Sequence, residues 1–245
     1  MFGRKKKSIA KSKQETEKYR HCRVMTDLFE NDDAVQSWRV FRIVSEFVNG
    51  FEILRKYGTA ATFFGSARFS PTDEYYKAAE DLAARLSKAG FAIITGGGPG
   101  VMEAGNVGAF KVGGQSVGLN IKLPVEQKLN TYVTESEDFH FFFSRKVMLS
   151  FASEVYVYFP GGFGTMDELF EIITLIQTKK ISRIPVVLYG EEFWKPLIAF
   201  MEKQMVKKYK TISEEDMDIF HVVDSVDEAF QYIRTHVDPQ TPRQI

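Results

Sequence analysis

Residues 155–165 read VYVYFPGGFGT, in which an apolar run is followed by a proline and then by glycines that lead into a helical pattern. Residues 91–101 read FAIITGGGPGV and residues 60–66 read AATFFGS, so the same order occurs three times. Short apolar runs without alternation are typical of strands buried on both faces of a parallel sheet. The three stretches therefore predict three parallel strands, each of which ends in a glycine loop.

The rest of the chain continues the alternation of strand and helix. Apolar spacing predicts further strands near 116–121, 131–133, 185–189 and 219–223, and helices over 72–89, 101–112, 141–152, 165–179, 193–208 and 226–236. Helices between such strands require right-handed parallel crossovers. We expect an α/β fold, a doubly wound Rossmann-like parallel sheet of about seven strands.

The N-terminal region differs from the rest. Residues 1–30 are polar and rich in lysine, which predicts a flexible basic tail. Apolar residues at helical spacing over 32–57 predict an added N-terminal helix that packs on the core. No internal repeat or low-complexity linker follows, so residues 31–245 are expected to form a single domain.

Composition argues against several partners. The chain has 32 basic and 32 acidic residues, so there is no net positive field to favour nucleic acid or a membrane surface. Cys22 is the single cysteine, which excludes an intramolecular disulfide and a multi-cysteine metal site. The basic start is not followed by an apolar segment of secretory length, and no run approaches a membrane span. We expect a cytoplasmic protein.

The glycine loops predict an anion site. Glycine lets backbone N–H groups approach a ligand, and the helix that follows directs its positive dipole end at the same place. A single loop of this kind is well explained as a tight turn, but three at the carboxyl edge of one sheet favour a ligand crevice. Residues 96–101 are not followed by the lysine of a phosphate-binding P-loop and do not form a G-x-G-x-x-G motif, which disfavours triphosphates and dinucleotides.

Charged residues flank these loops. Thr165 and Glu168 are three apart at a helix start, which fits a capping box, but a carboxylate beside an anion site also fits a group that orients or deprotonates water. Arg145 and Lys146 follow the stretch FHFFF at 139–143. They fit either a solvated basic turn or a group that stabilises ligand charge. The aromatic stretch fits core or dimer surface better than a base-stacking platform.

These residues carry a family resemblance. The stretch PGGFGTMDE at 160–168 matches the PGGxGTxxE signature of the LONELY GUY (LOG) family, and Arg145 and Lys146 match its companion RK motif. Residues 96–104 resemble the other glycine loop of that family, so the resemblance covers about 58–235. Pro99, Glu103 and Ala104 depart from the GGGSxGLMG of shorter members, and the added helix is similar to larger members. The departures leave the base of the substrate open.

The resemblance implies a phosphoribohydrolase that converts a purine nucleoside 5′-monophosphate, AMP or a cytokinin riboside 5′-monophosphate, to free base and ribose 5-phosphate. It implies no metal and no organic cofactor, and a homodimer or higher oligomer. The label "lysine decarboxylase-like" finds no support, because no pyridoxal phosphate site is recognisable. The alternative is a non-catalytic nucleotide or molybdenum-cofactor carrier of the same fold.

The resemblance also assigns roles by position. It implies that Arg145 and Glu168 are catalytic. The residues implied in substrate binding fall into three groups: Gly162, Gly164 and Thr165 at the 5′-phosphate; Lys146 and Glu126 in the nucleotide pocket; and Gly65, Ser66, Gly97, Gly98 and Met102 on the ribose and base side.

Overall fold

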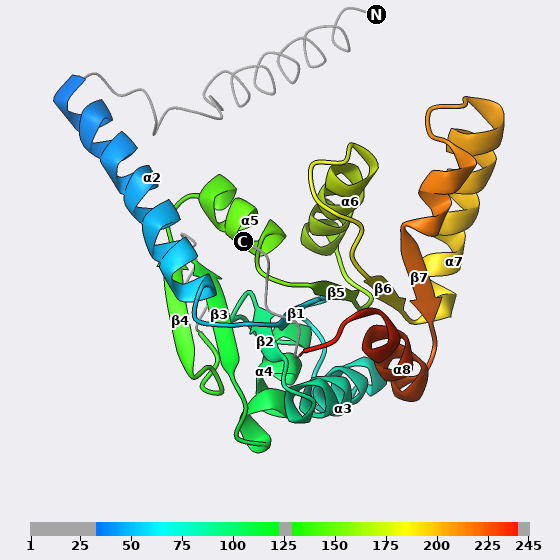
Figure 1. The fold of residues 1–245 in the computed structure, drawn as a ribbon, viewed down its shortest axis with the longest axis horizontal. Coiled ribbons are helices and arrows are strands. Elements are labelled where there is room, and N and C mark those ends of the chain that lie inside the picture. Colours follow the sequence, from blue (N-terminus) through cyan, green and yellow to red (C-terminus); the bar gives the residue numbers. More distant parts are fainter. Residues whose placement is uncertain (1–32, 123–128, 240–245) are drawn as a thin grey trace, which may run out of the picture. The chain divides into compact units, whose positions relative to one another are not determined.

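The computed structural model describes residues 33–122 and 129–239 (Figure 1). The expected tail over residues 1–30 lies outside these residues. The chain divides into two units, residues 1–44 and 45–245. Helix α2, Asp33–Leu54, runs across the division.

The strands of the second unit form one sheet. The strands are β1 (Ala60–Phe64), β2 (Ala92–Thr95), β3 (Ser116–Ile121), β4 (Glu135–Phe139), β5 (Val155–Tyr158), β6 (Val186–Tyr189) and β7 (Phe220–Val223). The seven strands are all parallel and lie in the order β4-β3-β2-β1-β5-β6-β7. The expected doubly wound parallel sheet is therefore confirmed. The strand order reverses between β1 and β5, and such a switch point is where open α/β sheets bind ligands.

Helices cover both faces of the sheet. They are α3 (Glu74–Lys88), α4 (Val101–Lys111), α5 (Phe142–Ser150), α6 (Phe163–Gln177), α7 (Glu191–Phe200) and α8 (Val226–His236), with a π-helix η2 (Met201–Lys208) and a short 3₁₀ helix η3 (Glu214–Asp218). The core cluster on one face includes side chains of α5, α6 and α7, and the cluster on the other includes those of α3, α4 and α8. Strand β1 contributes side chains to both clusters, because Ala60 and Phe64 belong to the first cluster and Ala61 and Phe63 to the second.

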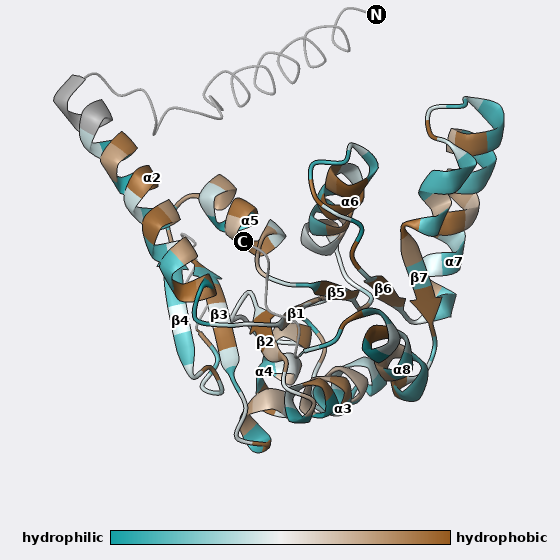
Figure 2. Ribbon diagram, in the orientation of Figure 1, coloured by the Kyte–Doolittle hydropathy of each residue, from teal (hydrophilic) through white to brown (hydrophobic). Residues whose placement is uncertain are grey.

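The strand expected at 131–133 is wrong. Strand β4 lies later, at Glu135–Phe139, and pairs with β3 from Val117↔Glu135 to Ile121↔Phe139. It is an edge strand next to β3 with polar, partly exposed residues, and it is drawn largely teal, whereas β5 and β6 are brown (Figure 2). Val133 is apolar for another reason, since its side chain packs over Gly118 of β3. An apolar-run criterion misses a strand of this kind.

The part of helix α2 that belongs to the second unit packs on the core as expected. Glu46, Gly50, Ile53 and Leu54 are buried and follow helical spacing, and Ile53 and Leu54 belong to the first core cluster. No helix among residues 33–122 and 129–239 is long and apolar enough to cross a membrane.

Candidate functional site

The loop after β5 leads directly into α6. The helix begins at Phe163 with Gly162 as its N-cap residue, and no side chain of the described residues caps it. The proposed capping box is therefore wrong: Thr165 is the third residue of the helix, and Glu168 lies nearly a turn further on. The first backbone hydrogen bond of the helix runs from Met166 N to Gly162 O at 3.1 Å. The N–H groups of residues 163–165 thus lack helical acceptors, which suits an anion.

Gly161 lets this turn close on itself. A Cβ at this position would overlap Oγ1 and Cβ of Thr165. Thr165 is buried, whereas Gly162, Phe163 and Gly164 are exposed. Gly161 therefore packs against the buried Thr165 side chain, and the first residues of the helix lie at the surface.

A cavity of about 640 Å³ opens in front of this turn. Among the residues expected to bind substrate or catalyse, it brings together eight: Gly65, Ser66, Met102, Arg145, Gly162, Gly164, Thr165 and Glu168. They come from the loops after β1 and β5 and from α4, α5 and α6. Segments distant in the sequence thus meet at the switch point of the sheet.

Glu168 is a buried carboxylate in the wall of this cavity. It is 8% exposed, and burial raises its pKa from 4.5 to about 7. The charge of Arg145 opposes this shift and that of Glu171 adds to it. A carboxyl group with this pKa exchanges a proton near neutral pH, which is the property that a general acid or base needs.

Arg145 lies against the second glycine loop. Its Nε donates a hydrogen bond to Leu119 O at 2.8 Å. A Cβ at Gly96 would overlap Nη2 of Arg145 and would come within 2.8 Å of Met102 Sδ, so only glycine leaves room for this guanidinium. Burial lowers the pKa of Arg145, and the nearby Glu168 carboxylate counters this effect. A guanidinium stays protonated in proteins, so Arg145 supplies fixed positive charge.

Three expected residues within the described part of the chain do not line the cavity. Gly97 and Gly98 are buried, and their carbonyl oxygens accept hydrogen bonds from the Asn130 side chain at 3.1 and 3.2 Å. Lys146 pairs instead with Asp167 at 2.6 Å and Glu171 at 3.4 Å. Glu126 lies outside the described residues. Gly97 and Gly98 therefore shape the loop, and Lys146 ties α5 to α6.

The cavity also contains residues that the sequence did not single out. Arg68, Phe142, Phe163 and Asp167 line it, and Phe163 is 96% exposed. Arg68 and Arg145 are the cationic side chains among the described lining residues. Arg68 lies three residues after Gly65, in the loop that follows the buried strand β1. This position was the sequence feature by which Arg68 could have been predicted as a site residue.

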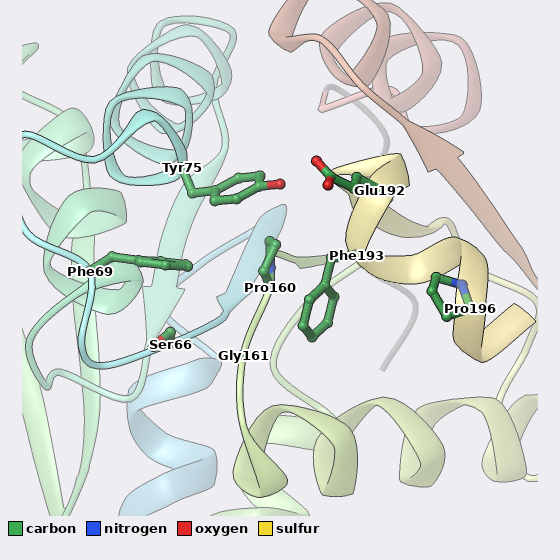
Figure 3. A pocket seen from close by; sticks show the side chains of 8 residues that line it. All are labelled: Ser66, Phe69, Tyr75, Pro160, Gly161, Glu192, Phe193 and Pro196. Atoms are coloured by element: carbon green, nitrogen blue, oxygen red, sulfur yellow. The ribbon is translucent and has the colours of Figure 1, made fainter.

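A second cavity, of about 580 Å³, adjoins the first at Ser66. Figure 3 shows the Tyr75 hydroxyl and the Glu192 carboxylate pointing toward one another, with the rings of Phe69 and Phe193 lower in the view. Phe69 and Tyr75 pack with ring centroids 5.5 Å apart. This cavity has a carboxylate and no cation among its described lining residues, so a phosphate fits the first cavity and not the second.

Fold and cavity together define a Rossmann-like α/β protein with a cavity at the sheet's switch point, where uncapped amides and two arginines would favour an anion. Residues 102–233 match the family model described as "Possible lysine decarboxylase", and the chain belongs to this family. This is the family in which the LONELY GUY proteins are placed, so the resemblance seen in the sequence is confirmed.

Two relatives carry an activity in their names. A cytokinin riboside 5′-monophosphate phosphoribohydrolase of Rhodococcoides fascians is 24% identical over 155 residues, which covers 62% of this chain and 78% of the relative. A protein of the same name from Arabidopsis thaliana is 28% identical over 158 residues, covering 62% and 72%. These relatives indicate a hydrolase at the level of the family, at low identity.

Solved structures show the same fold. A molybdenum cofactor binding protein from Rippkaea orientalis superposes with a TM-score of 0.55 at 20% identity, over 73% of this chain and 96% of that one. The molybdenum cofactor carrier protein of Chlamydomonas reinhardtii gives a TM-score of 0.54 at 22% identity, over 73% and 97%. At such identity the likeness extends to the fold alone.

Proposed function

We propose that this protein hydrolyses the N-glycosidic bond of a purine nucleoside 5′-monophosphate, AMP or a cytokinin riboside 5′-monophosphate, and releases free base and ribose 5-phosphate. The strongest support for this proposal is the environment of Glu168. The buried carboxyl of Glu168, with its pKa near 7, shares a cavity with an uncapped helix N-terminus and with Arg145, whose positive charge acts on it. A site that only bound a phosphate would gain nothing from a buried carboxylate.

The substrate would be held by its phosphate. The 5′-phosphate accepts hydrogen bonds from the amides of residues 163–165 and lies at the positive end of α6. Arg68 adds positive charge at the open side of the cavity. With the phosphate fixed there, the ribose extends toward Glu168, which lies further along the same helix.

The chemistry follows that of other glycosidic hydrolyses. The bond from C1′ to the base nitrogen breaks, its electron pair leaves with the base, and positive charge develops on the ribose ring. Ionised Glu168 stabilises this charge and accepts a proton from the water whose oxygen adds to C1′. Arg145 stabilises the electron pair on the departing base. The base takes up a proton, Glu168 releases its own to solvent, and one water molecule is consumed.

The test is product formation. Wild type, Glu168→Gln and Arg145→Ala are incubated with AMP and with isopentenyladenosine 5′-monophosphate, and ribose 5-phosphate and free base are measured by chromatography. Both variants are expected to lose activity, while Glu215→Gln, an exposed carboxylate on η3, keeps it. Equal rates in wild type and Glu168→Gln would exclude the proposed role of Glu168. Tight nucleotide binding without product would favour the carrier alternative.

The homodimer implied by the family resemblance remains a prediction. Phe139 of the aromatic stretch is buried, whereas Phe142 and Phe143 are exposed, which supports a surface role for part of this stretch. Light scattering coupled to size-exclusion chromatography measures the oligomeric state directly.

A further inference from the structure

Helix α5, which carries Arg145, begins without a cap of its own. Its N-cap residue is Phe141, no side-chain cap is present in the N-cap position, and its first turn contains no acidic residue. The first four N–H groups of a helix have no acceptor within that helix and need one from elsewhere when they are not in water. Arg145 is the fourth residue of α5, and its N–H donates to Phe141 O at 3.3 Å, which closes this first turn.

The acceptor comes from helix α2. Glu46 is only 5% exposed, and its Oε1 accepts a hydrogen bond from His140 N at 2.8 Å. Its Oε2 accepts from Phe141 N at 3.4 Å and from the Ser144 hydroxyl. The ring Nδ1 of His140 lies 3.3 Å from the same carboxylate. The carboxylate thus spans the start of α5, from the residue before the N-cap to the neighbour of Arg145.

The next turn of α2 also packs closely on α5. Gly50 is one helical turn beyond Glu46, and a Cβ there would lie 2.5 Å from Cγ and Sδ of Met148. Only a glycine allows the α2 backbone to come this close to α5. Glu46 and Gly50 therefore fix α5 at two points, its N-terminus and its middle.

A local cap would satisfy the N-terminus of α5 more simply. Serine, threonine or aspartate at the N-cap position caps a helix without burying a charge, whereas burial of a carboxylate is costly unless it is hydrogen-bonded. The carboxylate of Glu46 does more than cap, because it joins α5 to a helix nearly a hundred residues earlier in the chain. What it holds in place is the turn from which Arg145 reaches Gly96 and Leu119 O.

We propose that Glu46 is a positioning residue for Arg145. By holding the first turn of α5 through His140, Phe141 and Ser144, it keeps the guanidinium of Arg145 at the cavity wall. This inference rests on the proposed function for its kinetic readout. A second readout, hydrogen exchange at Arg145, does not depend on the proposed function.

The kinetic test is a double-mutant cycle with AMP as substrate. Glu46→Ala is expected to lower kcat at least tenfold with little change in KM, because phosphate binding at α6 is untouched. Glu46→Gln keeps one acceptor oxygen and should retain more activity than Glu46→Ala. In an Arg145→Ala background, Glu46→Ala should lower kcat less than twofold, because the group that it positions is already gone.

The control removes a cap elsewhere. Ser225 caps α8 by accepting from Glu228 N at 3.2 Å, and α8 contributes no residue to the cavity. Ser225→Ala should therefore leave kcat within twofold of wild type. If Glu46→Ala lowers kcat by the same factor with and without Arg145, Glu46 has a general structural role and the inference is overturned.

The second readout works even if AMP is not hydrolysed. The Nε–H of Arg145 donates to Leu119 O, so its proton should exchange slowly with solvent and be visible by ¹⁵N NMR. In folded Glu46→Ala this proton should exchange at least tenfold faster, and in Ser225→Ala it should not change. Unchanged protection in Glu46→Ala overturns the positioning role, whereas absence of hydrolysis in wild type overturns only the proposed function.

Discussion

Replacing Glu168 by glutamine should abolish activity and stabilise the protein at the same time. Burial raises the pKa of Glu168 from 4.5 to about 7, so between these values the unfolded chain releases a proton that the folded chain keeps. The contribution of this group to stability is therefore most favourable when it is protonated, below pH 4.5, and falls as the pH rises toward 7. At about 1.4 kcal/mol per pH unit, the ionised carboxylate costs the folded state about 3 kcal/mol above pH 7.

Glutamine has the shape of protonated glutamate and does not titrate. The difference in unfolding free energy between Glu168→Gln and wild type should grow from about 1 kcal/mol at pH 5 to about 3 kcal/mol at pH 8. Other groups titrate alike in both proteins and cancel in this difference.

Urea unfolding followed by circular dichroism at both pH values measures the difference. Glu215→Gln serves as the exposed control and should show no growth with pH. A difference for Glu168→Gln that is the same at pH 5 and pH 8 would refute the assignment of a raised pKa to this group.

Three further predictions concern activity. In wild type, kcat/KM for AMP should rise with pH as Glu168 ionises, reach half its maximum near pH 7 and level off about one pH unit higher, and a flat profile from pH 5 to 8 would contradict its role as base. Gly96→Ala displaces the Arg145 guanidinium and should lower kcat about a hundredfold, whereas Gly58→Ala, with no heavy atom within 4 Å of the new methyl group, should not. If the two variants have similar kcat values, the fit of Arg145 over Gly96 is unimportant. Thr165→Ala keeps the backbone amide but removes the hydroxyl that the family resemblance places at the 5′-phosphate, so it should raise KM for AMP about tenfold with kcat nearly unchanged; an effect on kcat alone would place Thr165 elsewhere in the mechanism.

Strands were predictable where burial on both faces leaves an unbroken apolar run, as in β1, β2 and β5. Strand β4 was not, since an edge strand needs no such run and its ESEDF sequence reads as a polar loop. The start of α6 was predicted at residue 165, whereas the helix begins at Phe163. Thr165 and Glu168 have the spacing of a capping box, but the helix begins at Phe163 with Gly162 as its N-cap residue, which leaves the amides of the first turn free for a ligand.

The fold class, the three glycine loops and the residue types that surround an anion could be predicted from the sequence, because burial periodicity and motif spacing are local properties. Which of those residues share a cavity depended on tertiary packing. It separated Lys146, which pairs with Asp167, from Arg145, which reaches Gly96, although the two are adjacent in the chain. It also brought Glu46 to the start of α5. Such contacts depend on how the helices pack on the sheet. No local sequence pattern states which residues from distant segments will be close in space.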